Sequence, residues 1–139
     1  MRLDLYHSEC CRIANEQSSL LQEAQEKLLN KQSLSKLEQN GVLHGLQVLI
    51  ENAIGKSKHL LKGLGESVPI SAYDSFINLH AKHKINDHEL EQWNAAIGLR
   101  NRIVHEYMNV DIRIVLDLIE KNEYQFIVDF LLKPFPLSS

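Results

Sequence analysis

Apolar residues recur every three or four positions along most of the chain, which is the spacing of amphipathic α-helices. Few β-branched residues alternate with polar ones as they would in strands. The prolines fall in one mid-chain loop and near the C-terminus, at Pro69, Pro134 and Pro136. Long stretches are therefore free of helix breakers, and the pattern predicts an all-α protein.

Two long helices are predicted in the first half of the chain. The first runs from about Leu3 to about Asn30. The second carries apolar positions from Leu37 to Leu61, with Ser33 or Ser35 as its cap, and stops at Gly63-Leu64-Gly65. This Gly-x-Gly follows a helix and lacks the Lys-Ser/Thr of a nucleotide-binding loop, so we interpret it as a helix stop.

The second half predicts a short helix and two longer ones. The short helix follows a loop over residues 66–71, carries apolar residues from Phe76 to Ala81 and fades at residues 83–85. The fourth helix begins at Asn86 or Asp87 and continues through Tyr107. A single closing helix begins at Asn109 or Asp111.

Pro134 stops this closing helix. Long helices joined by short loops pack most readily as an antiparallel bundle. We expect four main helices plus a short one, in a single domain over residues 1–139.

The chain of 139 residues is 44% hydrophobic and carries a net charge of −3. This composition suits one globular domain with a core. Nonspecific coating of nucleic acid needs many Lys and Arg residues to neutralise phosphates, so any contact with nucleic acid should be local, and no DNA binding is expected.

The cysteines Cys10 and Cys11 are adjacent, so they cannot form an ordinary disulfide with each other, and they lack the spacing of a zinc or redox motif. A reducing cytoplasm fits best. No apolar run approaches the length of a membrane span, and the N-terminus has charges and His7 where a signal peptide needs an apolar stretch. We expect a cytoplasmic protein without a membrane partner.

Groups that can handle a phosphate or a proton gather in one short run of the fourth helix. They are Arg100, Asn101, Arg102, His105 and Tyr107. A histidine near neutral pH can take a proton from a ribose 2′-hydroxyl or give one to a leaving oxygen. An arginine can hold the phosphate and its developing charge. This set favours cleavage of a phosphodiester, and it needs no cofactor.

Asn101 can orient His105 or donate to a phosphate oxygen. Glu106 is a lone acid beside His105, which disfavours a carboxylate cage for two metal ions. On an ideal helix, Asn101 and His105 share a face, whereas Arg100 and His105 lie about 140° apart. They can converge if the helix end unwinds, if the long Arg100 side chain reaches round, or if a second subunit completes the site. We favour the last two together, in a homodimer.

Structural readings of the same residues stay open. An arginine on a bundle helix is most often a surface or ion-pair residue, and Asn101 with His105 can be a satisfied polar pair. Tyr107 can be a core ring with its hydroxyl at the rim. Trp93 is expected in the core.

The segment from Leu99 to Tyr107 resembles the signature of HEPN-domain proteins, in particular the HepT-like toxins. That signature has an arginine, a polar residue directly after it, a histidine four to six residues further along, and a tyrosine two residues after the histidine. Arg100, Asn101, His105 and Tyr107 occupy these positions. The all-helical pattern and the length of the chain also resemble this family.

The resemblance implies a HEPN-like bundle and a metal-independent endoribonuclease that acts on RNA as a homodimer with one composite cleft. It implies Arg100 and His105 as the catalytic pair, Asn101 as their polar helper, and Arg102 as a local substrate contact. It further implies that an MntA-type nucleotidyltransferase antitoxin transfers AMP to Tyr107. The added phosphate and bulk would then repel and block RNA.

Two other functions compete with this interpretation. One is a non-catalytic helical module that binds a nucleotidyltransferase or is modified by it. The other is a metal site built on His80, His83 and His88, although paired carboxylates are lacking and the three histidines straddle a predicted loop.

Overall fold

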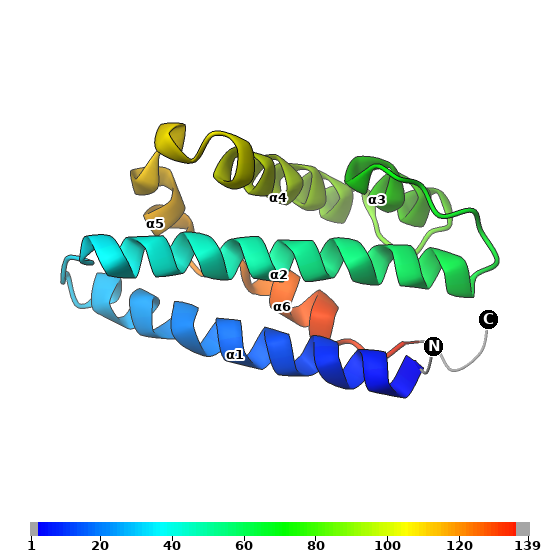
Figure 1. Ribbon diagram of the computed structural model, residues 1–139, viewed down its shortest axis with the longest axis horizontal. Coiled ribbons are helices and arrows are strands. Elements are labelled where there is room, and N and C mark those ends of the chain that lie inside the picture. Colours follow the sequence, from blue (N-terminus) through cyan, green and yellow to red (C-terminus); the bar gives the residue numbers. More distant parts are fainter. Residues whose placement is uncertain (1–2, 136–139) are drawn as a thin grey trace.

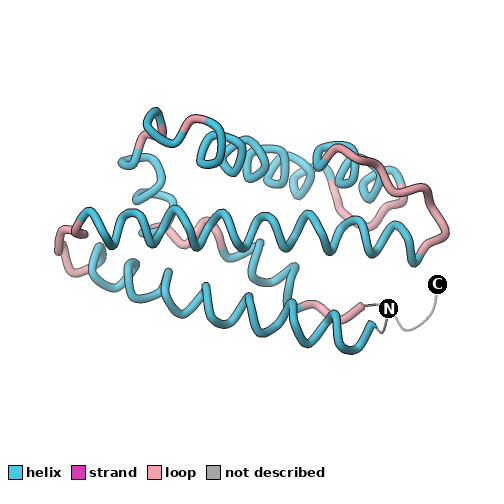
Figure 2. Tube along the Cα trace, viewed as in Figure 1, coloured by secondary structure: helices cyan, strands magenta, loops and turns pink. Residues whose placement is uncertain are grey.

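The computed structural model describes residues 3–135, and over this range the chain forms helices joined by loops, with no strand (Figure 2). The predicted all-α class is confirmed. Pro136, one of the three prolines, lies outside the described residues. In chain order the helices are α1 (Leu3–Leu29), α2 (Lys36–Gly63), α3 (Ala72–Ala81), α4 (Asp87–His105), the 3-10 helix η1 (Tyr107–Asn109), α5 (Ile112–Glu120) and α6 (Gln125–Leu132).

The long helices begin where side chains cap their first turn. Ser35 Oγ accepts from the backbone N–H of Glu38 at 3.1 Å, and the Glu38 carboxylate accepts from the Ser35 N–H at 2.8 Å. Asn86 and Glu89 form the same reciprocal pair at the start of α4. Such a capping box satisfies donors that the first turn leaves unpaired. At the other end of α2, Gly65 adopts a φ of +79°, which confirms the predicted glycine stop.

Helix α2 is the centre of the bundle, because it packs against α1, α3, α4 and α6. Figure 1 shows α1 and α4 on opposite sides of α2, both running antiparallel to it. Consequently the C-terminal end of α4 lies beside the N-terminal half of α2. None of the helices in the described part of the chain is both long and apolar enough to cross a membrane.

An aromatic cluster fixes the first half of α4. Trp93 stacks on Phe76 of α3, with ring centroids 4.4 Å apart, and meets the rings of Phe126 and Phe130 of α6 edge-on at 5.0 and 4.9 Å. Trp93 is 2% exposed, as expected for a core residue. Each such ring removes a large apolar surface from water, so this part of α4 has little freedom to move.

Two helix boundaries differ from the prediction. The fourth helix ends at His105, and Tyr107 begins a separate 3-10 turn. The closing helix was expected to be continuous, but it is broken between Glu120 and Gln125 into α5 and α6. Asn122 has a φ of +58°, in the left-handed region that asparagine tolerates better than most residues. The left-handed Asn122 therefore lets the chain turn sharply between α5 and α6, although this segment contains neither glycine nor proline.

Candidate active site

The arginine of the motif is held by a residue from another helix. Arg100 Nε and Nη2 donate to a single carboxylate oxygen of Glu51 on α2, at 3.0 and 2.8 Å. A third donor, Arg100 Nη1, reaches the side-chain oxygen of Asn101 at 3.2 Å. The ion pair that the sequence left open for Arg100 is therefore present, with Glu51 as the partner.

This arrangement leaves part of the guanidinium group available. Arginine has five N–H donors, and Glu51 and Asn101 take three of them. The Arg100 side chain retains 27% of its surface exposed. One N–H on Nη1 and one on Nη2 thus remain on a guanidinium whose orientation is already fixed, and charged N–H donors of this kind bind phosphate oxygens strongly.

Asn101 pairs with Arg100 and not with His105. Its side-chain oxygen is taken by the arginine, so its NH₂ group is the part left to donate. The alternative reading, a satisfied polar pair of Asn101 and His105, is absent among the hydrogen bonds of residues 3–135.

His105 and Arg102 lie in the last turn of α4 and are exposed. Within residues 3–135, no hydrogen bond or ion pair engages either side chain. His105 is thus accessible to a ligand, while the structure does not bring it into contact with Arg100. One copy of the chain presents the two groups separately, as the helical spacing indicates.

Tyr107 lies at the start of η1, and its hydroxyl donates to the side-chain oxygen of Asn40 on α2 at 2.6 Å. The ring is 43% exposed, so the alternative of a core tyrosine is wrong. A phenol at the surface with its proton directed to an acceptor leaves the oxygen lone pairs open to an electrophile.

Asn40 and Glu51 were not identified from the sequence. They are eleven residues apart, which is about three turns of helix, so they share one face of α2. His44 and Gln47 lie between them on this face at helical spacing, and Gln47 donates to Glu51 at 3.3 Å. The signal was a polar stripe, Asn40, His44, Gln47 and Glu51, whose intervening residues within 40–51 are all apolar or glycine. Only the antiparallel packing of α2 on α4 reveals what it faces.

The other polar candidates form no site. The His80 ring nitrogen pairs with Asp87 at 2.6 Å, and across residues 3–135 no three His, Cys, Asp or Glu side chains are grouped as metal ligands. The structure gives no support to the metal site of His80, His83 and His88. Cys10 is buried, which raises the pKa of its thiol and makes it a poor nucleophile.

The chain is similar in sequence to a described protein family and to known proteins. The family described as Ribonuclease HepT-like matches residues 14–133. A protein of Aphanizomenon flos-aquae named tRNA nuclease HepT is 33% identical over 106 residues, which are 75% of this chain and 65% of that protein. A putative RNase of Archaeoglobus fulgidus is 35% identical over 88 residues, 61% of this chain and 64% of that protein. The matches thus span less than two thirds of each relative's length.

Two solved structures share the fold. A HEPN toxin of Shewanella oneidensis, tri-AMPylated and in complex with an MNT antitoxin, superposes with a TM-score of 0.76 at 21% identity, covering 91% of this chain and 96% of that one. A toxin–antitoxin crystal structure with AMP-PNP gives a TM-score of 0.75 at 18% identity, covering 91% and 97%. Both confirm the HEPN-like helical bundle.

Proposed function

Because the chain belongs to the HepT-like ribonuclease family, we propose that it is a metal-independent endoribonuclease and the toxin of a toxin–antitoxin pair. The observation that supports this proposal most strongly is the way in which the Arg100 side chain is held. Glu51 and Asn101 fix its guanidinium and leave two N–H donors for a phosphate. The relative named tRNA nuclease makes tRNA the first substrate to test.

In the proposed reaction, the ribose 2′-oxygen attacks the adjacent phosphorus atom while His105 accepts its proton. The 5′-oxygen leaves with a proton from the imidazolium form of His105 or of the partner copy's His105. Arg100 holds the non-bridging oxygens, whose charge grows in the transition state, and the Asn101 NH₂ donates to one of them. Arg102 contacts a neighbouring phosphate. The proton and the charge are both handled by side chains, so the step needs no metal.

The two catalytic groups come from different copies in a homodimer. Arg100 and His105 lie about 140° apart around α4, and His105 is exposed. Figure 1 shows the start of α2, the turn after α4 and helix α5 at this same end of the bundle. These segments carry exposed apolar residues: Leu37 at 82%, Met108 at 91% and Ile114 at 64%. Burial of such a patch favours association, and a second copy would place its own His105 near Arg100.

The regulation we propose is adenylylation of Tyr107 by a nucleotidyltransferase antitoxin. The phenol oxygen attacks the α-phosphorus of ATP, pyrophosphate leaves, and the phenolic proton is released. Tyr107 is exposed and follows His105 by two residues. The added phosphate and nucleoside would occupy and repel the space that RNA needs. The AMPylated toxin of Shewanella oneidensis supports this proposal by its name and fold.

The main test compares wild type, Arg100→Ala, His105→Ala and the distant surface variant Lys121→Met on purified tRNA, with a chelator present. We expect cleavage by wild type and Lys121→Met, and a loss of about 100-fold or more in the other two. If wild type does not cleave RNA, or if all four cleave it equally, the enzyme proposal fails. A non-catalytic module modified by its partner then remains.

Mixing the two inactive variants tests the composite site. After subunit exchange, a mixed dimer of Arg100→Ala and His105→Ala carries one cleft with both groups intact. We expect cleavage to reappear in the mixture. If light scattering shows a dimer but the mixture stays inactive, Arg100 and His105 act within one copy.

Adenylylation is tested by coexpression with the nucleotidyltransferase, followed by mass spectrometry. An added adenylyl mass on the Tyr107 peptide, absent in Tyr107→Phe, supports the proposal. An unmodified Tyr107 peptide contradicts it.

A further inference from the structure

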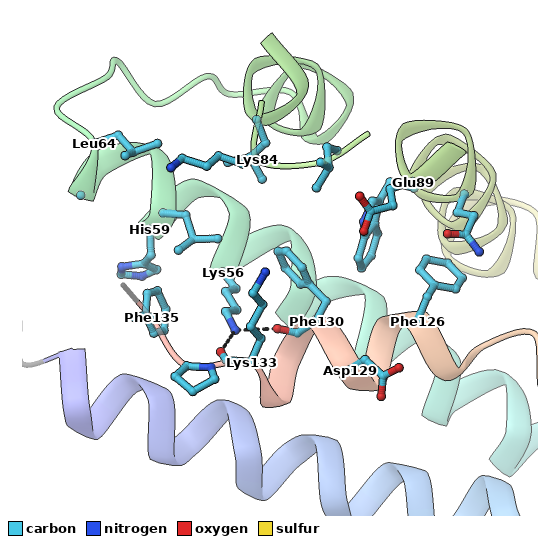
Figure 3. Close-up of a pocket in the computed structure, with 17 residues that line it drawn as sticks. Lys56, His59, Leu64, Lys84, Glu89, Phe126, Asp129, Phe130, Lys133 and Phe135 are labelled. Carbon is cyan, nitrogen blue, oxygen red and sulfur yellow. Dashed lines mark hydrogen bonds between the residues drawn. The ribbon is translucent and has the colours of Figure 1, made fainter. Parts of the chain in front are cut away.

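A cavity of about 550 Å³ opens between the C-terminal half of α2, the first half of α4 and α6 (Figure 3). The cavity is separate from the motif. The motif lies at the C-terminal end of α4, beside the N-terminal half of α2, which is the other end of the bundle. Its size falls in the range of sites for small organic molecules, roughly 300–1,000 Å³. Aromatic rings supply much of its wall, among them Trp93, Phe126, Phe130 and Phe135.

Two lysines reach into this cavity from opposite walls. Figure 3 shows Lys84 entering from the loop between α3 and α4, and Lys133 rising from the end of α6. Within residues 3–135, neither ammonium group has a hydrogen bond or an ion pair. Two unpaired cations facing one apolar space are a place where an anion gains favourable contacts.

The acids of the same cavity do not neutralise these lysines. Asp129 accepts a hydrogen bond from Gln125 at 3.0 Å. Figure 3 shows Asp129 and Glu89 on the side of Phe126, away from Lys84 and Leu64. The cavity therefore has one cationic side and one acidic side, with rings between them.

The wall around Lys133 is fixed by a third lysine. Lys56 is 2% exposed, and its ammonium donates to the backbone oxygens of Phe130, Leu131 and Lys133. It also lies 5.2 and 5.0 Å from the centroids of the Phe130 and Phe135 rings. These contacts cap α6 and hold both rings, so the cavity is formed before any ligand arrives.

We propose that this cavity binds a small organic anion with a flat aromatic ring system, its rings against Phe126 and Phe130 and its anionic group between Lys84 and Lys133. The rings provide apolar contact, and the two lysines select for negative charge. Trp93, the one tryptophan of the chain, meets both of these rings edge-on, so its fluorescence responds to a ligand bound against them.

The experiment uses biphenyl-4-acetate as the probe, with excitation at the red edge of tryptophan absorption, where the biphenyl does not absorb. We expect a saturable change in Trp93 fluorescence and a calorimetric stoichiometry of one probe per chain. The double variant Lys84→Met/Lys133→Met should bind at least about tenfold more weakly, because it loses two charge-assisted contacts. Lys121→Met, whose lysine is outside the cavity, serves as the matched control and should bind as wild type does.

Two matched ligands test the charge requirement. The uncharged 4-biphenylmethanol and the cationic 4-biphenylmethylamine should both bind more weakly than the acid. No saturable signal with the acid, or equal affinity of the acid and the amine, would overturn the proposal. Equal affinity of wild type and the double lysine variant would overturn it as well. Because fluorescence and calorimetry report binding directly, these outcomes do not depend on RNA cleavage.

Discussion

Glu51 accepts two hydrogen bonds from Arg100 with one carboxylate oxygen, and so a residue on α2 sets the direction of the proposed phosphate-binding group on α4. The Glu51 side chain is itself 36% exposed and the Arg100 side chain 27%. Such a part-exposed pair contributes about 1 kcal/mol or less to folding. Its greater effect is on the orientation of Arg100, because it selects which N–H groups face outward.

Glu51→Gln should therefore lower kcat about tenfold with little change in KM. The amide keeps a hydrogen-bond acceptor but loses the charge that holds both N–H groups, so Arg100 samples orientations that miss the transition state. Steady-state kinetics on RNA and a thermal melt check this expectation. A fall in melting temperature that accounts for the lost activity would indicate a structural role only, and an unchanged kcat would rule out positioning.

Arg102 is exposed and has no side-chain partner within residues 3–135, so we expect it to contact a phosphate of bound RNA. Arg102→Met should raise KM and reduce the slope of log affinity against log salt by about 0.7, the value for one phosphate of a single strand. Binding titrations over a range of salt concentrations measure this slope. An unchanged slope, equal to that of Lys121→Met, would place Arg102 away from the RNA.

The hydrogen bond from Tyr107 to Asn40 predicts the behaviour of the modification step. Asn40→Ala removes the acceptor that fixes the phenol, so AMP transfer to Tyr107 should slow by about tenfold, the value of one hydrogen bond. RNA cleavage should stay near wild type. A mass-spectrometric time course with the partner enzyme gives the rate, and Tyr107→Phe gives the background. Transfer as fast as in wild type would mean that the partner positions the tyrosine unaided.

Lys56 is a buried lysine that stabilises the fold without a carboxylate partner. Lys56→Met keeps the apolar stem but leaves carbonyls at the end of α6 without their donor. We expect a loss of about 1–3 kcal/mol in the free energy of unfolding. Urea denaturation measures it, and Lys58→Met, whose lysine bonds only the Ile70 oxygen on the surface, is the control. Equal stability of Lys56→Met and wild type would contradict this role.

Burial against Tyr6, with ring centroids 4.0 Å apart, and the nearby Lys62 charge both lower the pKa of His59 in the folded protein. The unfolded chain then binds more protons than the folded one, so stability falls as the pH drops through about 6.5 toward the folded pKa. Urea midpoints at about pH 8 and about pH 5.5 should show this loss. His59→Gln should show a smaller difference between the two pH values. An equal difference in both proteins would assign the loss to other groups.

Local signals in the sequence predicted most of the fold. The caps at Ser35 and Asn86 and the glycine stop act within one helical turn, and such signals are readable from neighbouring residues. The break at Asn122 was missed because nothing in the neighbouring sequence distinguishes a tolerated left-handed asparagine from a helical one. In the candidate site, the motif on α4 was found by its spacing. Glu51 was missed because its partner is 49 residues away in the chain.

The polar stripe on α2 fixes the distance between the two parts of the site. Asn40 and Glu51 belong to one uninterrupted helix, so the anchor of Tyr107 and the anchor of Arg100 are about 16 Å apart along its axis. The connection from Glu106 to Asp111 can change in length or sequence without altering this separation. The proposed AMP group on Tyr107 would therefore start from a point whose distance to Arg100 is set by a continuous helix and not by a loop.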